Sequence, residues 1–148
     1  MKKKKRILVS ACLVGIKCRY DGKEKENKEL LALSDEFDFF PMCPEELGGL
    51  PTPRVPSEIR DGKVINKDGV DVTEKYLRGA EATLKICRIC NFDTVVLKSK
   101  SPSCGKGLIY DGSFSGNLVH GNGITTDYLL KNGIKVYSED EFIKEFKR

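Results

Sequence analysis

Cys104 follows a short apolar segment, and this arrangement constrains the fold of the chain more than any other feature of the sequence. Residues 94–97, Thr-Val-Val-Leu, are apolar and mostly β-branched, which is typical of a strand buried in a parallel sheet. Residues 101–105, Ser-Pro-Ser-Cys-Gly, form a turn of small residues, and Pro102 has no N–H to continue a strand ladder. Cys104 is therefore expected at the carboxyl edge of a sheet, where open α/β sheets bind ligands.

The same order of apolar segment and cysteine occurs twice more in the chain. Residues 7–10, Ile-Leu-Val-Ser, precede Cys12, and residues 37–40, Phe-Asp-Phe-Phe, precede Cys43. Parallel strands place their carboxyl ends at one edge of a sheet. Cys12, Cys43 and Cys104 are therefore predicted to converge, although 31 and 61 residues separate them in sequence.

Stretches with the spacing of amphipathic helices lie between these apolar segments. The main helix is expected to begin at an N-cap Thr73 and to end near Asn91. This alternation predicts an α/β fold, a three-layer Rossmann-like domain with a mainly parallel sheet. The other expected elements are a short helix after an N-cap Asn27, a helix opened by Thr125 or Thr126, a strand at 134–137, and a last helix at 142–146 with a capping box of Ser138 and Glu141.

Residues 46–71 interrupt the periodic pattern. Their segment 48–58 holds three prolines and two glycines, and long loops in compact domains are usually functional or disordered. Because the segment begins beside Cys43, we expect a long loop or arm that covers the carboxyl ends of the strands. Val64 and Ile65, flanked by Asp-Gly pairs, indicate a small hairpin in this arm.

The length and charge of the chain limit the number of domains and the kinds of partner. A chain of 148 residues with 39% hydrophobic content suits one core, so a single domain is expected over 1–148, with residues 1–6 as a basic mobile tail. The formal net charge is +4, but residues 2–6 supply five positive charges and leave −1 for the rest. A near-neutral body argues against a broad face for nucleic acid, although a local basic stripe remains compatible with it.

The apolar segments are too short for export or membrane insertion. Only residues 7–11 precede Cys12, whereas a signal peptide needs an apolar region of about 7–15 residues. No other run approaches the roughly 18 apolar residues of a membrane span. We therefore expect a cytoplasmic protein without membrane partners, in which six cysteines indicate metal binding or catalysis rather than three disulfides.

Three converging thiols suit a soft metal. In a cubane [4Fe–4S] cluster held by Cys12, Cys43 and Cys104, three irons would have protein ligands and the fourth would stay open as a Lewis acid. Zinc bound by three cysteines is the alternative, and the spacing does not separate the two. The simplest reading of any one of these residues alone is a buried thiol under a loop.

Cys87 and Cys90 form a Cys-x-x-Cys pair that would attract attention in a motif search. They lie at the end of the expected main helix, which places them at the amino edge of the sheet, away from the other three cysteines. A zinc site there would need two further ligands. Packing is the favoured interpretation for this pair.

Three polar residues near the predicted thiol cluster are candidates for proton transfer or substrate binding. Glu45 follows Cys43 by two residues and can act as acid or base, or as a solvated or helix-capping carboxylate. Ser101 can hold substrate through its hydroxyl, or make ordinary turn hydrogen bonds. Arg54 in the covering loop can bind a polar substrate or pair with Glu58.

Six motifs of the chain include the surroundings of Cys12, Cys43 and Cys104. They are Ser-Ala-Cys-Leu-Val-Gly at 10–15, Cys-Arg-Tyr-Asp-Gly at 18–22, Cys-Pro-Glu at 43–45, Gly-Gly-Leu-Pro-Thr-Pro-Arg-Val-Pro-Ser-Glu at 48–58, Ser-Pro-Ser-Cys-Gly at 101–105 and Tyr-Asp-Gly-Ser-Phe-Ser-Gly at 110–116. Taken together, these motifs resemble the thiouracil desulfidase family. The resemblance extends from Ile7 to about Glu139.

The resemblance implies a [4Fe–4S] cluster on Cys12, Cys43 and Cys104, with one open iron that binds the sulfur of a thiolated pyrimidine. Water then replaces sulfur without net electron transfer, giving uracil from 2- or 4-thiouracil. Glu45 and Ser101 are the positions that the resemblance assigns to proton transfer. Cys18 matches the family pattern without an assigned role, and such a protein would obtain its cluster from the iron–sulfur assembly machinery.

Two other functions stay open at this stage. Some relatives act on thiolated uridine in RNA, so thiolated tRNA is an alternative substrate. A non-catalytic iron–sulfur or zinc-binding module is the alternative to an enzyme.

Overall fold

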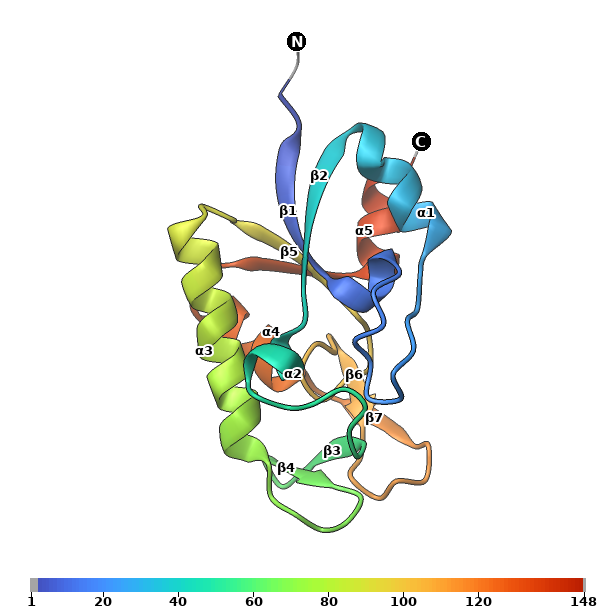
Figure 1. Cartoon of the computed structure of the whole chain (residues 1–148), viewed down its shortest axis with the longest axis vertical. Helices are drawn as coiled ribbons and strands as arrows, with labels where there is room; N and C mark the ends of the chain where they lie inside the picture. The colour runs from blue at the N-terminus through green and yellow to red at the C-terminus, as the bar shows by residue number, and fades with distance from the viewer. Residues whose placement is uncertain (1–2, 148) are drawn as a thin grey trace.

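A four-stranded parallel sheet forms the centre of the chain in the computed structural model, which describes residues 3–147 (Figure 1). The strand order is β2-β1-β5-β8. The α/β fold and the mainly parallel sheet predicted from the sequence are therefore confirmed. The strands are β1 (Lys5–Ser10), β2 (Phe37–Met42), β5 (Thr94–Leu97) and β8 (Lys135–Ser138).

Helices cover both faces of this sheet and give three layers. The helices α3 (Thr73–Ile89) and α4 (Ile124–Lys131) lie on one face, and α1 (Lys28–Leu31) and α5 (Glu139–Phe146) lie on the other (Figure 1). Successive strand residues point to opposite faces. Val96 accordingly packs with Phe142 of α5, while Val95 and Leu97 pack with Leu129 of α4. The strand β5 is buried along its whole length, as its apolar sequence predicts.

The predicted helix caps are partly confirmed. The side chain of Asn27 accepts a hydrogen bond from the N–H of Leu30, and Ser138 and Glu141 form the expected capping box. Thr73, however, is the first residue of α3 rather than its cap, because its Oγ1 accepts a hydrogen bond from Val64 N at 2.8 Å.

The start of α4 also differs from the prediction. Gly123 is its N-cap, not Thr125 or Thr126. The Thr125 hydroxyl is 2.8 Å from that of Ser103, and the Thr126 hydroxyl donates to Cys104 O at 2.8 Å. Both threonines thus attach α4 to the loop that carries Cys104.

Two hairpins lie beyond the carboxyl ends of β1 and β2 (Figure 1). The strands β3 (Ser57–Arg60) and β4 (Lys63–Asn66) form the expected arm, whose hairpin is longer than the sequence indicated. The strands β6 (Leu108–Tyr110) and β7 (Leu118–His120) form a second hairpin that the sequence pattern did not predict. The short helices are α2 (Pro44–Leu47), η1 (Ala11–Val14) and η2 (Ala32–Asp35), of which the last two are 3-10 helices.

The sheet begins earlier in the chain than expected. Lys5 and Arg6, which were assigned to the basic tail, belong to β1. The Arg6 guanidinium lies 4.8 Å from the ring centre of Phe40 and 4.7 Å from that of Phe92, and it donates to Cys90 O at 2.7 Å. Cation–π contacts therefore hold Arg6 against the sheet. Residues 1 and 2 of the expected tail lie outside the described residues.

None of the helices within residues 3–147 has both the length and the apolar character needed to cross a membrane.

Candidate functional site

A cavity of about 610 Å³ lies at the carboxyl ends of the strands, beneath the two hairpins. Four of the six cysteines line it, namely Cys12, Cys18, Cys43 and Cys104. The structure thus brings together the three cysteines whose convergence was predicted from parallel strand ends. It also adds Cys18, to which the sequence analysis gave no role. All six cysteines are free thiols.

Each of the three predicted cysteines is positioned by the turn that follows its strand. Cys12 lies in η1 directly after β1, and Cys43 is the N-cap of α2 directly after β2. Cys104 lies in the loop after β5, where Ser101 Oγ accepts hydrogen bonds from Ser103 N at 3.1 Å and Cys104 N at 2.7 Å. Burial raises the pKa of the Cys104 thiol to about 12.

Ser10 connects the loop of Cys104 to the neighbouring strand β1. Its hydroxyl donates to Cys104 Sγ at 3.7 Å and accepts from Lys98 N at 3.0 Å. Glu139, at the start of α5, accepts from Ser99 N at 2.8 Å and pairs with Lys98 Nζ at 3.3 Å. The wall that carries Cys104 is therefore attached to both β1 and α5.

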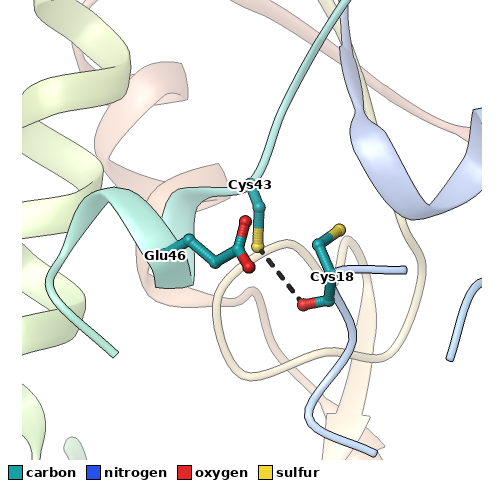
Figure 2. Close-up of side chains that lie close together, drawn as sticks. All are labelled: Cys18, Cys43 and Glu46. Atoms are coloured by element: carbon teal, nitrogen blue, oxygen red, sulfur yellow. Dashed lines mark hydrogen bonds between the residues drawn. The ribbon is translucent and has the colours of Figure 1, made fainter. Parts of the chain in front are cut away.

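Cys18 reaches the site because the chain after η1 turns back on itself. Gly15 has a φ of 94°, a left-handed conformation that favours glycine, and Ile16 N donates to Ala11 O at 3.1 Å. Cys18 then lies beside Cys43, whose thiol donates to Cys18 O at 3.8 Å (Figure 2). A hydrogen bond with the Cys12 thiol raises the pKa of Cys18 to about 11.

Glu45 is held in place by two donors on other elements. Its Oε1 accepts from Arg54 Nε at 3.1 Å and from the Tyr76 hydroxyl at 2.7 Å. The Arg54 side chain is only 5% exposed, and although its burial disfavours the charged form, the Glu45 carboxylate raises the pKa of Arg54. Arg54 therefore pairs with Glu45. The alternative of a pair with Glu58 is wrong.

Arg54 also joins the arm to the thiols. Its guanidinium donates to Cys18 O at 2.9 Å and lies 3.9 Å from Cys43 Sγ. Burial and the neighbouring Glu45 carboxylate raise the pKa of Tyr76, so its hydroxyl remains a donor to that carboxylate. Tyr76 is a site residue that the sequence analysis missed, since its place on the main helix indicated only packing.

Comparisons with known proteins agree with this geometry. The profile of a family described as 2-thiouracil desulfurase matches residues 7–141. The chain belongs to the 2-thiouracil desulfurase family. The uncharacterized protein YbbK of Bacillus subtilis (strain 168) is 44% identical over 145 residues, which cover 91% of this chain and 96% of YbbK. The solved structure of the [4Fe-4S]-dependent thiouracil desulfidase TudS has a TM-score of 0.88 and 45% identity, with 95% of each chain covered.

The four thiols of this 2-thiouracil desulfurase family member form a donor set that fits an iron–sulfur cluster. Thiolates are the usual protein ligands of such clusters, and three of the thiols are buried at the base of the cavity. Cys87 and Cys90, in contrast, do not line the cavity. They pack with Leu84 and Phe92 in the core.

Aromatic and basic side chains surround the mouth of the cavity. Glu58 accepts hydrogen bonds from Gly112 N at 3.0 Å and Phe114 N at 3.1 Å, and thereby holds the loop that carries Phe114 over the site. Phe114 has a φ of 57°, an unfavourable backbone conformation for a bulky residue that such contacts must maintain. Tyr20 and Tyr110 are further aromatic residues of the lining.

Three exposed lysines, Lys25, Lys67 and Lys100, also line this mouth. No salt bridge involves any of them within the part of the chain that the structure describes. These three lysines therefore add positive charge to the lining of the cavity.

Proposed function

We propose that the chain catalyses the [4Fe–4S]-dependent desulfuration of thiolated pyrimidines, which converts 2- or 4-thiouracil into uracil and sulfide. The observation that carries this proposal is a single cavity lined by cysteine thiols together with Glu45 and Arg54, in which Tyr76 holds the Glu45 carboxylate. The chain is 45% identical to the desulfidase TudS, and the two structures match over 95% of this chain. This similarity supports the same chemistry.

We assign the cluster to Cys12, Cys43 and Cys104, which are delivered by three strand ends. Cys43 is the N-cap of α2, Cys104 lies in the loop after β5, and both line the same cavity as Cys12. When bound, a cluster with three protein ligands supplies one iron that acts as a Lewis acid toward the substrate sulfur.

The proposed reaction is non-redox. A C=S group and water give C=O and hydrogen sulfide, so oxygen replaces sulfur at carbon and no electrons are gained or lost. The protein must therefore accept a proton from water and donate protons to the departing sulfur. These are tasks for a positioned acid and base.

Glu45 is suited to accept the proton of water. Arg54 and Tyr76 both use its Oε1. Within residues 3–147 no hydrogen bond is made to its Oε2, which leaves that oxygen for a water molecule in the cavity.

Ser101 is suited to donate. Its oxygen accepts from two backbone N–H groups, so the remaining role of its hydroxyl is that of a donor toward the cavity.

The aromatic lining suits a planar heterocycle. The rings of Tyr20, Tyr110 and Phe114 surround the mouth, and stacking on an aromatic side chain contributes about 1–3 kcal/mol per base. A pyrimidine that enters past these rings meets the thiols and Glu45 at the base of the cavity.

Thiolated tRNA is the second candidate substrate. Lys25, Lys67 and Lys100 favour it, because a neutral base needs no cationic rim whereas a phosphate backbone does. We further propose that the protein acts in the cytoplasm and receives its cluster from the iron–sulfur assembly machinery.

Anaerobic purification followed by two assays tests this function. We expect about four iron and four sulfide per chain. We also expect equal amounts of uracil and sulfide from 2- or 4-thiouracil, with thiolated tRNA assayed in parallel. Stoichiometric zinc without iron, or a full cluster without turnover of any of these substrates, would instead identify a non-catalytic metal-binding module.

A further inference from the structure

Cys18, which the cluster assignment does not use, lies close to Cys43, which it does use. Their sulfur atoms are within 4.8 Å of each other, and the Cys43 thiol donates to Cys18 O at 3.8 Å. The Cys104 thiol accepts a hydrogen bond from Ser10 instead. The site therefore contains a second set of sulfur donors, Cys18 and Cys43, which overlaps the proposed cluster ligands at Cys43.

A carboxylate completes this second set. The sulfur atoms of Cys18 and Cys43 and a carboxylate oxygen of Glu46 all lie within 4.8 Å of one another (Figure 2). Two thiolates on a tetrahedral zinc ion lie about 3.8 Å apart, given a Zn–S distance of about 2.3 Å. Cys43 is only partly buried and Glu46 is exposed, so both side chains can make the small movement that coordination requires.

The charges around this group suit a divalent cation. Two thiolates, one carboxylate and one divalent ion carry a net charge of −1, and the buried guanidinium of Arg54 lies 3.9 Å from Cys43 Sγ. Arg54 offsets the excess negative charge of such a site. The sulfur-rich donor set selects a soft or borderline ion such as Zn²⁺ over Mg²⁺ or Ca²⁺.

We propose that the cluster-free chain binds one Zn²⁺ ion through Cys18, Cys43 and Glu46, with water as the fourth ligand. Because Cys43 is shared with the proposed cluster, zinc and the cluster exclude each other. Zinc bound in this way protects the thiols of the cluster-free chain and delays the insertion of the cluster. The inference goes beyond the proposed desulfuration and does not depend on it.

The test uses Co²⁺ as a spectroscopic substitute for zinc in the full-length, cluster-free chain under anaerobic conditions. The wild type is expected to bind one equivalent, with the thiolate-to-cobalt charge-transfer band and the visible bands of a tetrahedral site, and to release it to Zn²⁺. Cys18→Ala and Cys18→Ser are expected to weaken binding by more than about 100-fold, since loss of an outer-shell partner alone costs about 10–100-fold. Glu46→Gln should weaken it less.

Cys104→Ala is the matched control, because it removes a buried thiol of the same cavity that lies outside the second set. It should retain the cobalt spectrum, as should Cys87→Ala. A wild type without tetrahedral cobalt bands, Cys18 variants that bind normally, or loss of binding in folded Cys104→Ala would each overturn the zinc site. None of these results bears on thiouracil turnover by the cluster-loaded enzyme.

Pre-incubation with Zn²⁺ provides a second readout. It should slow cluster reconstitution in the wild type and in Cys87→Ala. Iron uptake by the Cys18→Ala chain should be insensitive to zinc, and zinc inhibition of equal size in that variant would contradict the assignment.

Discussion

The hydroxyl of Tyr76 on α3 donates a hydrogen bond of 2.7 Å to Glu45 Oε1 on α2. Tyr76 is 2% exposed, and Arg54 approaches the same oxygen from the arm. A buried tyrosine and a buried arginine therefore fix one oxygen of the carboxylate of Glu45, which lines the cavity. In the reaction that we propose, this relationship preorganises Glu45 as the base and makes Tyr76 its positioning residue.

Tyr76→Phe should lower kcat by about 10–100-fold, because hydrogen bonds to charged groups contribute about 1.5–3 kcal/mol. Iron content should be unchanged, since within residues 3–147 the Tyr76 hydroxyl makes no hydrogen bond to any of the proposed ligands. Steady-state kinetics on 2-thiouracil with the iron content measured in the same sample tests this. Tyr128→Phe is the control, because its hydroxyl makes no hydrogen bond within residues 3–147. Equal kcat in the two variants would show that Tyr76 has no positioning role.

Glu45→Gln should retain the cluster and lose about 10²–10⁴-fold in kcat. The amide preserves an acceptor for Tyr76 and Arg54 but cannot take a proton. The exposed Glu74 on α3, replaced by Gln, should behave like the wild type. Release of sulfide from thiouracil at the wild-type rate by Glu45→Gln would remove Glu45 from the mechanism.

Serine substitution of any one of Cys12, Cys43 or Cys104 should abolish stable cluster binding, measured as iron and sulfide per chain. Cys87→Ser should retain the full cluster, because its thiol packs in the core away from the cavity. Full cluster retention in any of the first three variants would require a different ligand set, in which Cys18 is the obvious substitute.

The strand ends could be predicted from sequence because their signals are local. The apolar segment before Cys104 and the capping box of Ser138 and Glu141 each involve only a few neighbouring residues, and both have the predicted structure. The convergence of the three cysteines followed from parallel strands alone. In contrast, the contact of Cys18 with Cys43 depends on a turn at Gly15 that carries no periodic signal.

The role of Tyr76 could not be predicted for a related reason. Its spacing on α3 is that of a core residue, and only the approach of α2 to α3 brings Glu45 to its hydroxyl. The prediction that Thr125 or Thr126 caps α4 failed because tertiary contacts with Ser103 and Cys104 O compete for their hydroxyls. Where side chains serve two elements at once, local rules for one element are insufficient.

Gly79→Ala should lower the free energy of unfolding by about 3 kcal/mol or more and also reduce turnover. A Cβ at Gly79 would lie 2.1 Å from Pro44 O, and one at Gly48 would lie 2.0 Å from Lys75 O, so α2 and α3 meet backbone to backbone. Separation of the helices would displace Cys43 and Glu45 together.

Gly49→Ala is the control for this contact, and denaturant unfolding measures both variants. A Cβ at Gly49 meets no atom within 4 Å, although its φ of 95° adds a backbone cost of about 1–2 kcal/mol. If the Gly79→Ala variant is as stable as the Gly49→Ala variant, α2 and α3 can separate without a loss in the free energy of unfolding.

Lys25, Lys67 and Lys100 form a lysine rim at the mouth of the cavity, and one variant of this rim distinguishes the two candidate substrates. Replacement of Lys25, Lys67 and Lys100 by alanine removes three positive charges from the mouth and none of the residues at the base of the cavity. If thiolated tRNA is the substrate, its binding should weaken, and the slope of log K against log salt should become shallower by about 2–3, because each phosphate contact contributes about 0.7–0.9. Turnover of 2-thiouracil should change less than about twofold in the same preparation, since a neutral base releases no counterions.

A matched triple replacement of Lys63, Lys75 and Lys144, which do not line the cavity, should leave both activities intact. Unchanged tRNA binding and salt slope in the rim variant would show that the rim does not contact phosphate, and the free base would then remain the favoured substrate.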